Sequence, residues 1–255
     1  MSKTPKHWFI SDTHFCASRP EHIDAFAKLC QLPEAGDSVL LLGDIFEIWV
    51  SDDLAEACDL QIEAELKQLT GRGVQVYFMH GNRDFMVGKD FCARTACKSL
   101  RDPSPWTLPD GRRCMLTHGD WFCTDEKSYR RYRLIVRNPL FQFIFRRLPK
   151  AKRLDIANNI RKNSIKAHRE NGQRSYDANA ELIQHYFDKY TEASCIIMGH
   201  THLPMLHQNQ AKARMVLGDW RDTLWYACAD QQRGLCLFEA DLKLEQNHCR
   251  YRLQA

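Results

Sequence analysis

The sequence predicts an α/β protein, because short apolar runs alternate with longer stretches of helical periodicity through its first half. Each run ends at a polar turn and is apolar throughout, as expected of strands that are buried on both faces. The runs are Trp8–Ser11, Val39–Leu42, Val74–Met79 and Cys114–Thr117, and the helical stretches are Ile23–Leu32 and Leu54–Thr70.

The second half predicts further strands that turns separate, with no long crossover helices between them. These candidate strands are Cys195–Met198, Met215–Leu217, Thr223–Ala229 and Leu235–Glu239. Between the two halves, the segment from about Thr124 to Tyr190 has a helical pattern almost throughout. No internal repeat of fixed period is present.

Composition excludes several classes of protein. The chain has 255 residues, 44% hydrophobic and 27% charged, which is enough for a large core and argues against disorder. The apolar runs fall far short of the roughly 18 residues that a membrane-spanning helix needs. The apolar piece near the N-terminus is too short for the core of a signal peptide, so we expect a cytoplasmic protein.

The eleven cysteines indicate reduced side chains. Their number is odd, and none forms a C-x-x-C pair. In a chain without a secretion signal, this pattern favours small buried hydrophobes over disulfides or a structural zinc site.

Positive charge is concentrated in one fifth of the chain. Residues 125–174 hold 15 Lys and Arg against 4 Asp and Glu, whereas the whole chain has a net charge of only +4. Such a block is typical of a site for nucleic acid, phospholipid headgroups or a phosphorylated substrate. The alternative is an ordinary solvated helical face.

An aromatic cluster lies inside this basic block. The segment Leu140–Leu148 contains three Phe residues, stands between Pro139 and Pro149, and carries Arg146 and Arg147. A proline at each end frames a short apolar helix. Its apolar side either packs on the body of the protein or meets acyl chains and the bilayer interface.

The ends of five predicted strands carry the chemistry. Each strand leads into a turn that holds a potential metal ligand, and most of these turns contain glycine. In order they read Asp12-Thr13-His14, Gly43-Asp44, Gly81-Asn82-Arg83-Asp84, Thr117-His118-Gly119-Asp120 and Gly199-His200-Thr201-His202.

These oxygen and imidazole donors suit Mn²⁺, Fe²⁺ or Zn²⁺. The set of seven ligands is too large for one ion, but it fits two ions if one carboxylate bridges them. Two metals held about 3.5 to 4 Å apart would clamp the oxygens of a phosphoryl group during in-line displacement. The predicted metal ligands are Asp12, His14, Asp44, Asn82, His118, His200 and His202.

The five turns resemble the calcineurin-like metallophosphoesterases, whose pattern D-x-H, G-D, G-N-x, x-H-G and G-H-x-H matches them in order. The resemblance implies a four-layer α/β sandwich. It also implies that Asp12, His14, Asp44 and His202 hold one metal, and that the other is held by Asp44, Asn82, His118 and His200. Asp44 would then be the bridging ligand.

Arg83, the residue directly after Asn82, indicates which type of phosphate bond the protein hydrolyses. Protein phosphatases and many nucleases of this superfamily have a His directly after the Asn, where it protonates the leaving group. An Arg cannot donate a proton near neutrality, but it can bind phosphate oxygens and neutralise charge in the transition state. A leaving phosphomonoester needs no protonation, so a pyrophosphate bond is the expected target. We expect Asp44, Asn82, Arg83 and His200 to be catalytic.

The residues that flank the five turns resemble those of one branch of the superfamily, the UDP-2,3-diacylglucosamine diphosphatases. Its members hydrolyse that lipid to UMP and 2,3-diacylglucosamine 1-phosphate in lipid A biosynthesis. The resemblance runs from about Trp8 to Trp220 and implies a helical cap that is inserted into the core and grips the acyl chains. We therefore expect residues 1–123 and 191–255 to form the core and residues 124–190 to form the inserted helical cap.

The same resemblance implies substrate contacts at Asn82, Arg83, Glu126, Ser164 and His200. Glu126 stands where the family usually has Asp and keeps the carboxylate. Two further cap positions depart from the family, with His168 in place of Asn and Asn171 in place of Lys.

We expect two divalent ions, with Mn²⁺ first and Fe²⁺ or Zn²⁺ as alternatives. The expected protein is a monomer that binds no nucleic acid and lies peripherally on the cytoplasmic face of the bacterial inner membrane. The alternatives are a metal-dependent phosphodiesterase or nuclease of the same superfamily, and a non-catalytic scaffold on the same fold.

Overall fold

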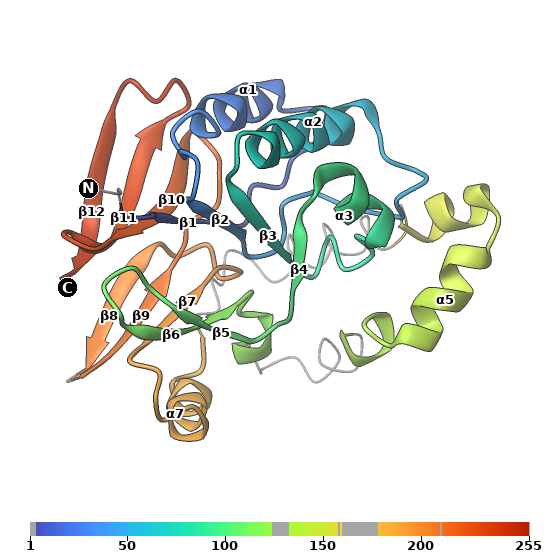
Figure 1. The fold of residues 1–255 in the computed structure, drawn as a ribbon. Helices are drawn as coiled ribbons and strands as arrows, with labels where there is room; N and C mark the ends of the chain where they lie inside the picture. Colours follow the sequence, from blue (N-terminus) through green and yellow to red (C-terminus); the bar gives the residue numbers. More distant parts are fainter. Residues whose placement is uncertain (1–3, 124–132, 158, 160–177, 210, 255) are drawn as a thin grey trace.

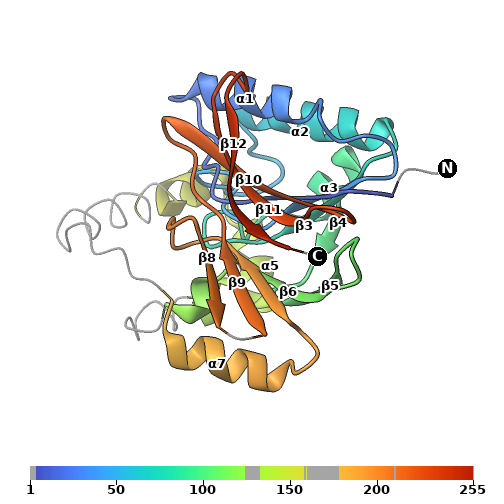
Figure 2. The same cartoon turned by 90° about the vertical axis from the view of Figure 1, so that its left-hand side faces the viewer.

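Two facing β-sheets and the helices outside them form four layers, as the family resemblance implies (Figures 1 and 2). The computed structural model describes residues 4–123, 133–157, 159, 178–209 and 211–254. Within this part of the chain, no helix is both long and apolar enough to cross a bilayer.

The first sheet has seven strands in the order β12-β11-β10-β1-β2-β3-β4. Strands β1 to β4 are parallel neighbours, connected by the helices α1 (Pro20–Leu29), α2 (Ala57–Gly71) and α3 (Lys89–Thr95), whereas β10 pairs antiparallel with β1. The strands are β1 (His7–Ile10), β2 (Ser38–Leu41), β3 (Gln75–Met79), β4 (Lys98–Leu100), β10 (Thr223–Asp230), β11 (Gly234–Asp241) and β12 (Asn247–Leu253).

The second sheet has five strands in the order β5-β6-β7-β9-β8, of which β6, β7 and β9 are parallel. Its outer face packs against α7 (Ala180–Lys189) through Phe187. The strands are β5 (Ser104–Thr107), β6 (Arg113–Thr117), β7 (Cys195–Met198), β8 (Met205–Asn209) and β9 (Lys212–Val216).

Three apolar clusters hold the layers together. Successive side chains of a strand point to opposite faces, so Trp8 and Ile10 pack under α1 and α2 while Phe9 packs between the sheets. Leu40 and Ile197, on opposite sheets, join Phe9 there and are fully buried. The inter-sheet cluster therefore fixes how the two sheets lie relative to each other.

The structure differs from the prediction at some elements. The first helix begins at Pro20 rather than Ile23, because proline is favoured in the first turn, where its missing N–H is not needed. The sequence did not predict α3, β4, β5, β8 or β12. Strand β12 is mostly exposed and lies at a sheet edge, so it lacks the apolar pattern that identifies buried strands.

The described part of the basic block is helical. Asn138 caps the N-terminus of helix α5 (Pro139–Arg147), because its side chain accepts a hydrogen bond from Leu140 N at 2.8 Å. Residues 133–136 and 150–157 are also helical. In Figure 1, α5 lies beside the sheets rather than over them. The cap boundaries at residues 124 and 190 stay a prediction.

Arginines fasten this segment to the core at two places. Arg153 binds both carboxylate oxygens of Asp53, at 2.7 and 2.9 Å. At the other end, Arg133 and Arg137 bind Asp102 and Asp120, two carboxylates whose side chains are at most 4% exposed. The base of α5 is thus tied to loops beside the strand ends.

A buried carboxylate at the start of α2 predicts a pH effect on stability. The Oδ2 atom of Asp59 accepts a hydrogen bond from Glu56 N at 2.8 Å, and burial raises the pKa of Asp59 to about 6. Below about pH 4 the group is protonated in both folded and unfolded chains, and it has no effect. Between about pH 4 and 6 the unfolded chain ionises while the folded chain keeps the proton, so the folded state loses about 2 to 3 kcal/mol of stability over this range, and the loss stays constant above pH 6.

Asp59→Asn keeps the accepting oxygen and removes this cost. We expect the variant to exceed the wild type in free energy of unfolding at pH 7.5 but not at pH 4, as measured by urea denaturation. The matched control is Asp24→Asn, on the exposed face of α1. A gain at Asp59 that is the same at both pH values would contradict the assignment.

Candidate dinuclear metal centre

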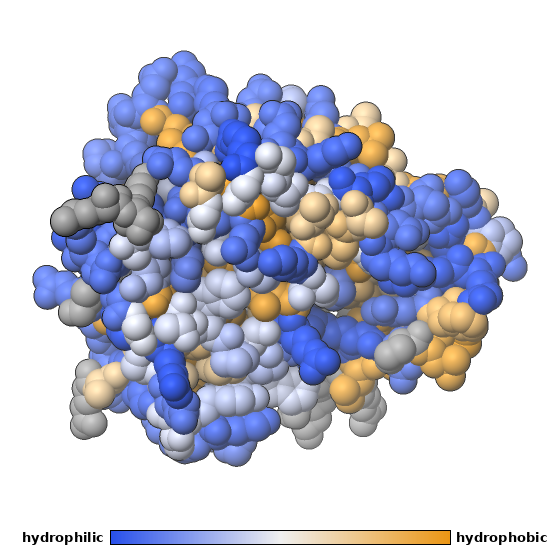
Figure 3. All heavy atoms as spheres, viewed as in Figure 1, coloured by the Kyte–Doolittle hydropathy of each residue, from blue (hydrophilic) through white to orange (hydrophobic). Residues whose placement is uncertain are grey.

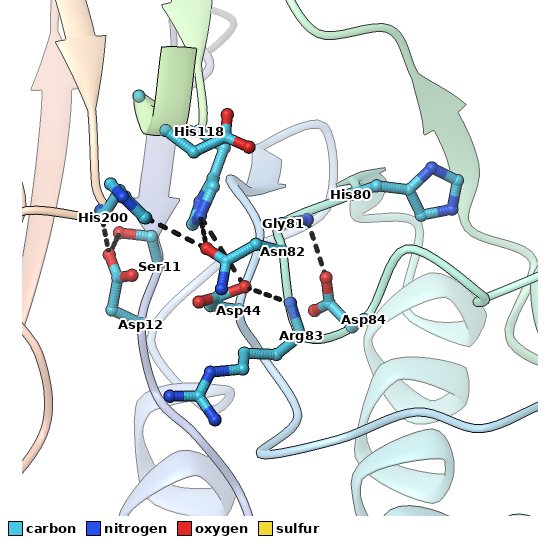
Figure 4. A network of polar contacts seen from close by, with 12 residues as sticks. Ser11, Asp12, Asp44, His80, Gly81, Asn82, Arg83, Asp84, His118 and His200 are labelled. Carbon is cyan, nitrogen blue, oxygen red and sulfur yellow. Dashed lines mark hydrogen bonds and ion pairs between the residues drawn. The ribbon is translucent and has the colours of Figure 1, made fainter. Parts of the chain in front are cut away.

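The predicted metal ligands come from the carboxyl ends of parallel strands in both sheets. Asp12, Asp44 and Asn82 follow β1, β2 and β3 in the first sheet. His118 follows β6 in the second sheet, and His200 and His202 follow β7. Because the sheets face each other, these ends converge, and Figure 4 shows Asp12, Asp44, Asn82, His118 and His200 pointing toward one another.

The turns that hold the predicted ligands have an unusual backbone conformation. Five of the seven predicted ligands have a positive φ, between 48° and 68°, a region that L-residues other than glycine seldom adopt. Such strain costs about 1 to 3 kcal/mol for each residue and concentrates at functional sites. These five ligands are Asp12, His14, Asp44, His200 and His202.

Glycine is required where the turns approach each other. A Cβ atom on Gly199 would lie 2.2 Å from Asp12 Oδ2, and one on Gly81 would lie 2.1 Å from Asp44 Oδ1. Either contact would displace a ligand carboxylate. The glycines therefore let a strand end pass directly against a ligand of a neighbouring turn.

The first group of ligands is Asp12, His14 and His202, whose donor atoms lie within 4.8 Å of one another. The Nε2 atoms of the two imidazoles are 3.4 Å apart, and His202 Nε2 lies 3.4 Å from Asp12 Oδ1. The other oxygen of Asp12 accepts hydrogen bonds from Ser11 Oγ at 2.6 Å and His200 N at 2.9 Å. This leaves Oδ1 directed at the two rings.

The second group is Asp44, His118 and His200, and Asn82 joins it. Asn82 Oδ1 lies 2.9 Å from His118 Nε2 and 3.0 Å from His200 Nδ1, and His118 Nε2 lies 3.6 Å from Asp44 Oδ1. The structure thus brings together all seven predicted ligands in two groups. The bridging role of Asp44 stays a prediction.

Burial and neighbouring charges set the protonation of the imidazoles. Burial lowers the pKa of His14 and His200 to about 3, so both rings are neutral and retain a lone pair at neutral pH. In His202, the nearby carboxylates of Asp12 and Asp219 outweigh burial and raise the pKa to about 10. Asp12 is also fully buried, but its contact with His202 outweighs burial and holds its pKa well below the usual range.

The donor set fits divalent cations. Asp12 Oδ1 is buried and accepts no hydrogen bond, although a buried carboxylate oxygen normally has a donor or a cation. Two imidazole Nε2 atoms face each other beside it at 3.4 Å, a separation natural for ligands that share an ion. Carboxylate, amide and imidazole donors without thiolates suit the Mn²⁺, Fe²⁺ and Zn²⁺ class.

Arg83 and Asp84 continue the loop that carries Asn82. The backbone N–H of Arg83 donates to Asp44 Oδ1 at 2.8 Å, while its guanidinium lies 3.4 Å from Glu47 Oε1 and is partly exposed. Asp84 is fully buried and accepts from Gly81 N at 2.7 Å and Ile45 N at 2.8 Å. Burial, together with the nearby charge of Asp44, raises the pKa of Asp84 to about 6.

Sequence reasoning assigned no role to Asp84, Glu47 or Asp219. Asp84 fastens the loop of Asn82 to the loop of Asp44, and the other two carboxylates lie behind imidazole ligands. Nothing in the local sequence identifies these supporting roles, because the contacts join turns that are far apart in the chain. Of the predicted cap contacts, Glu126 and Ser164 lie outside the described residues, as do His168 and Asn171.

An apolar pocket opens beside the metal ligands. Asn82, Arg83 and Glu47 line one part of it. Its remaining walls come from the core and from the helical segment around α5, and their side chains are almost all apolar. These residues are Ile48, Trp49, Val50, Phe85, Met86, Val136, Phe141, Phe145, Ile156 and Ala157.

The sequence is similar to known phosphoesterases. Residues 5–204 match the family model described as calcineurin-like phosphoesterase. A protein of Tolumonas auensis named UDP-2,3-diacylglucosamine hydrolase is 37% identical over 230 residues, which cover 88% of this chain and 93% of that protein. A protein of the same name from Stutzerimonas stutzeri is 38% identical over 227 residues, 87% of this chain and 94% of that one.

The matched family spans the five ligand turns and the strands that lead into them. The relatives extend the likeness over nearly the whole length of both chains. The chain therefore belongs to the calcineurin-like phosphoesterase family, and its sequence groups with the relatives that are named UDP-2,3-diacylglucosamine hydrolase.

Proposed function

We propose that the chain hydrolyses the pyrophosphate bond of UDP-2,3-diacylglucosamine, releasing UMP and 2,3-diacylglucosamine 1-phosphate for lipid A biosynthesis. The observation that carries this proposal is the apolar pocket whose lining includes Asn82 and Arg83. A substrate that fits both parts has a phosphate group at the ligands and an acyl chain beside it. The names of the relatives point to the same substrate.

Two divalent cations would be held by the seven predicted ligands, with Asp44 between them. Mn²⁺ is our first candidate, and Fe²⁺ or Zn²⁺ would accept the same donors. When bound, the two ions supply an activated water and neutralise charge on the phosphoryl oxygens. We assign Asp44, Asn82, Arg83 and His200 to catalysis.

Arg83 would bind the pyrophosphate oxygens. Its backbone is held by Asp44, and its partly exposed guanidinium lies at the pocket that would hold the acyl chain. A guanidinium is a fixed positive charge that binds phosphate oxygens in pairs, so the expected role of Arg83 is to stabilise negative charge rather than to transfer a proton. The lipid phosphate leaves without an acid, because it is already a good leaving group. Glu126 and Ser164 remain proposed contacts to the substrate.

The direct test is release of UMP from UDP-2,3-diacylglucosamine with added Mn²⁺ in water enriched in heavy oxygen. We expect the label in UMP, and we expect Asp44→Ala and Asn82→Ala each to abolish turnover because each removes a metal ligand. Bis-p-nitrophenyl phosphate serves as a generic diester in parallel. Hydrolysis of the diester alone would reject the lipid substrate and favour the general phosphodiesterase.

A larger side chain in the pocket tests where the acyl chain lies. Ala157 is buried, lines the pocket and belongs to the helical residues 150–157. Ala157→Leu should shorten the space available, so we expect KM to rise about tenfold for long-chain substrate while a short-chain analogue is turned over as before. The matched control is Ala193→Leu, a buried alanine that packs with α7 instead. Equal loss for both chain lengths would place the acyl chain elsewhere.

We further propose that the protein lies on the cytoplasmic face of the bacterial inner membrane through α5. Leu140, Phe143 and Ile144 are more than half exposed, and the Arg147 guanidinium lies over the Phe143 ring. Figure 3 shows hydrophobic atoms next to hydrophilic ones where Figure 1 places α5. Apolar side chains beside arginines are typical of helices at the headgroup level of anionic bilayers.

Vesicle binding tests this surface. The triple variant Leu140→Ser, Phe143→Ser, Ile144→Ser should bind vesicles that contain phosphatidylglycerol at least about tenfold more weakly, because each buried apolar side chain contributes 1 kcal/mol or more. Leu60→Ser is the control, since Leu60 is about as exposed but lies on α2. If both proteins bound vesicles as tightly as the wild type, α5 would not be the contact.

A further inference from the structure

The two groups of ligands differ in what lies behind their imidazoles. In the group of Asp12, His14 and His202, both Nε2 atoms face inward, and each outer Nδ1 faces a carboxylate. His202 Nδ1 lies 3.3 Å from Asp219 Oδ2, within hydrogen-bonding distance, whereas His14 Nδ1 lies 3.6 Å from Glu47 Oε2 and has no hydrogen-bond partner among the described residues, so Glu47 acts on it through charge. Two acidic side chains therefore back this one group.

The group of Asp44, Asn82, His118 and His200 is built differently. His118 Nδ1 lies 3.0 Å from the backbone carbonyl of Leu42, which carries no net charge. His200 turns its Nδ1 inward, toward Asn82 Oδ1. One of the oxygen donors in this group is a neutral amide, so the group holds less negative charge around the ion.

Backbone hydrogen bonds join the segments that carry Asp219 and Glu47 to the loop that carries Asp12 and His14. Trp220 N, one residue after Asp219, donates to Asp12 O at 3.2 Å, and the ring of Trp220 is buried against Phe15. Glu47 N donates to Phe15 O at 3.1 Å, one residue after His14. The positions of the two carboxylates relative to the imidazoles are therefore fixed in the folded chain.

A carboxylate behind a metal-bound imidazole has two effects. It fixes the tautomer by accepting the Nδ1 proton, so the Nε2 lone pair faces the ion, and it makes the imidazole a stronger donor. Loss of such a partner weakens metal binding by about 10- to 100-fold. A carbonyl partner orients the ring but supplies less negative charge.

We propose that Asp219 and Glu47 are positioning residues that make the group of Asp12, His14 and His202 the tighter of two cation sites. The first divalent cation binds there, and the second binds more weakly at Asp44, Asn82, His118 and His200. This inference rests on the proposed function, which requires both cations.

Asp219 is the cleaner of the two residues to test. Glu47 also lies 3.4 Å from the guanidinium of Arg83, so its loss would disturb substrate binding as well. The other contact of Asp219 is with Arg221, an exposed side chain whose Nε donates to Asp219 Oδ2 at 2.6 Å. Metal binding, rather than activity, is therefore the readout.

The experiment titrates the metal-stripped full chain with Mn²⁺ alone. Bound ions are counted by calorimetry, and free Mn²⁺ is followed by electron paramagnetic resonance. We expect two classes of one ion each, with dissociation constants at least about tenfold apart. Asp219→Asn should weaken the tight class about 10- to 100-fold. Glu47→Gln should weaken it by less, because Glu47 acts on His14 through charge without a hydrogen bond, and neither variant should change the weak class.

Three further variants make the assignment specific. Asp222→Asn removes an exposed carboxylate from the same loop and should change neither class. His14→Ala should abolish the tight class, whereas His118→Ala should abolish the weak one. If Asp219→Asn failed to fold, Asp219→Glu, which keeps a carboxylate, should retain most of the tight class.

The possible results separate this inference from the proposed function. Two classes of equal affinity in the wild type, or equal weakening of both classes in the Asp219 and Glu47 variants, would overturn the inference and leave the dinuclear centre intact. Loss of the weak class in His14→Ala would reverse the assignment and also overturn it. A wild-type chain that bound no Mn²⁺ would overturn the inference and the manganese centre together.

Discussion

The packing of one sheet against the other sets the distances between the donor atoms of the predicted metal ligands. No single strand or hairpin holds a complete group, because Asp12 and His202 come from different sheets, as do Asp44 and His118. Their separations depend on the inter-sheet cluster around Phe9, Leu40 and Ile197, whose side chains are fully buried. A shift of the sheets by one side chain would separate the donors beyond the reach of a shared ion.

The cluster is held in a costly conformation. Five of the predicted ligands adopt a left-handed backbone, and buried carboxylates lie against buried imidazoles. Hydrogen bonds within the turns offset this cost. For example, the backbone N–H groups of Gly81 and Ile45 donate to the Asp84 carboxylate and hold two of the turns together. The same bonds aim the donors before any ion arrives, so binding does not have to pay for ordering the turns.

Most buried strands and all seven predicted ligands could be identified from the sequence, because each ligand turn directly follows the apolar strand that positions it. Apolar strands that end in Asp, Asn or His report the fold and the ligand turns together, because the carboxyl ends of parallel strands share one edge. Exposed elements such as β12 were missed because no burial pattern marks them. Glu47 and Asp219 were missed as supporting residues because their role depends on contacts between turns that are far apart in the chain.

The arginines at the base of α5 bear on how the protein could have evolved. Arg133 and Arg137 neutralise Asp102 and Asp120, and Arg137 also donates to the carbonyl of Gly81, next to the ligand Asn82. Deleting the segment that carries them would remove the guanidinium partners of two buried carboxylates, a change that typically costs several kcal/mol. The helical segment that carries these arginines is therefore not a detachable module: a chimaera that exchanges it between relatives must carry both arginines along, or replace both aspartates.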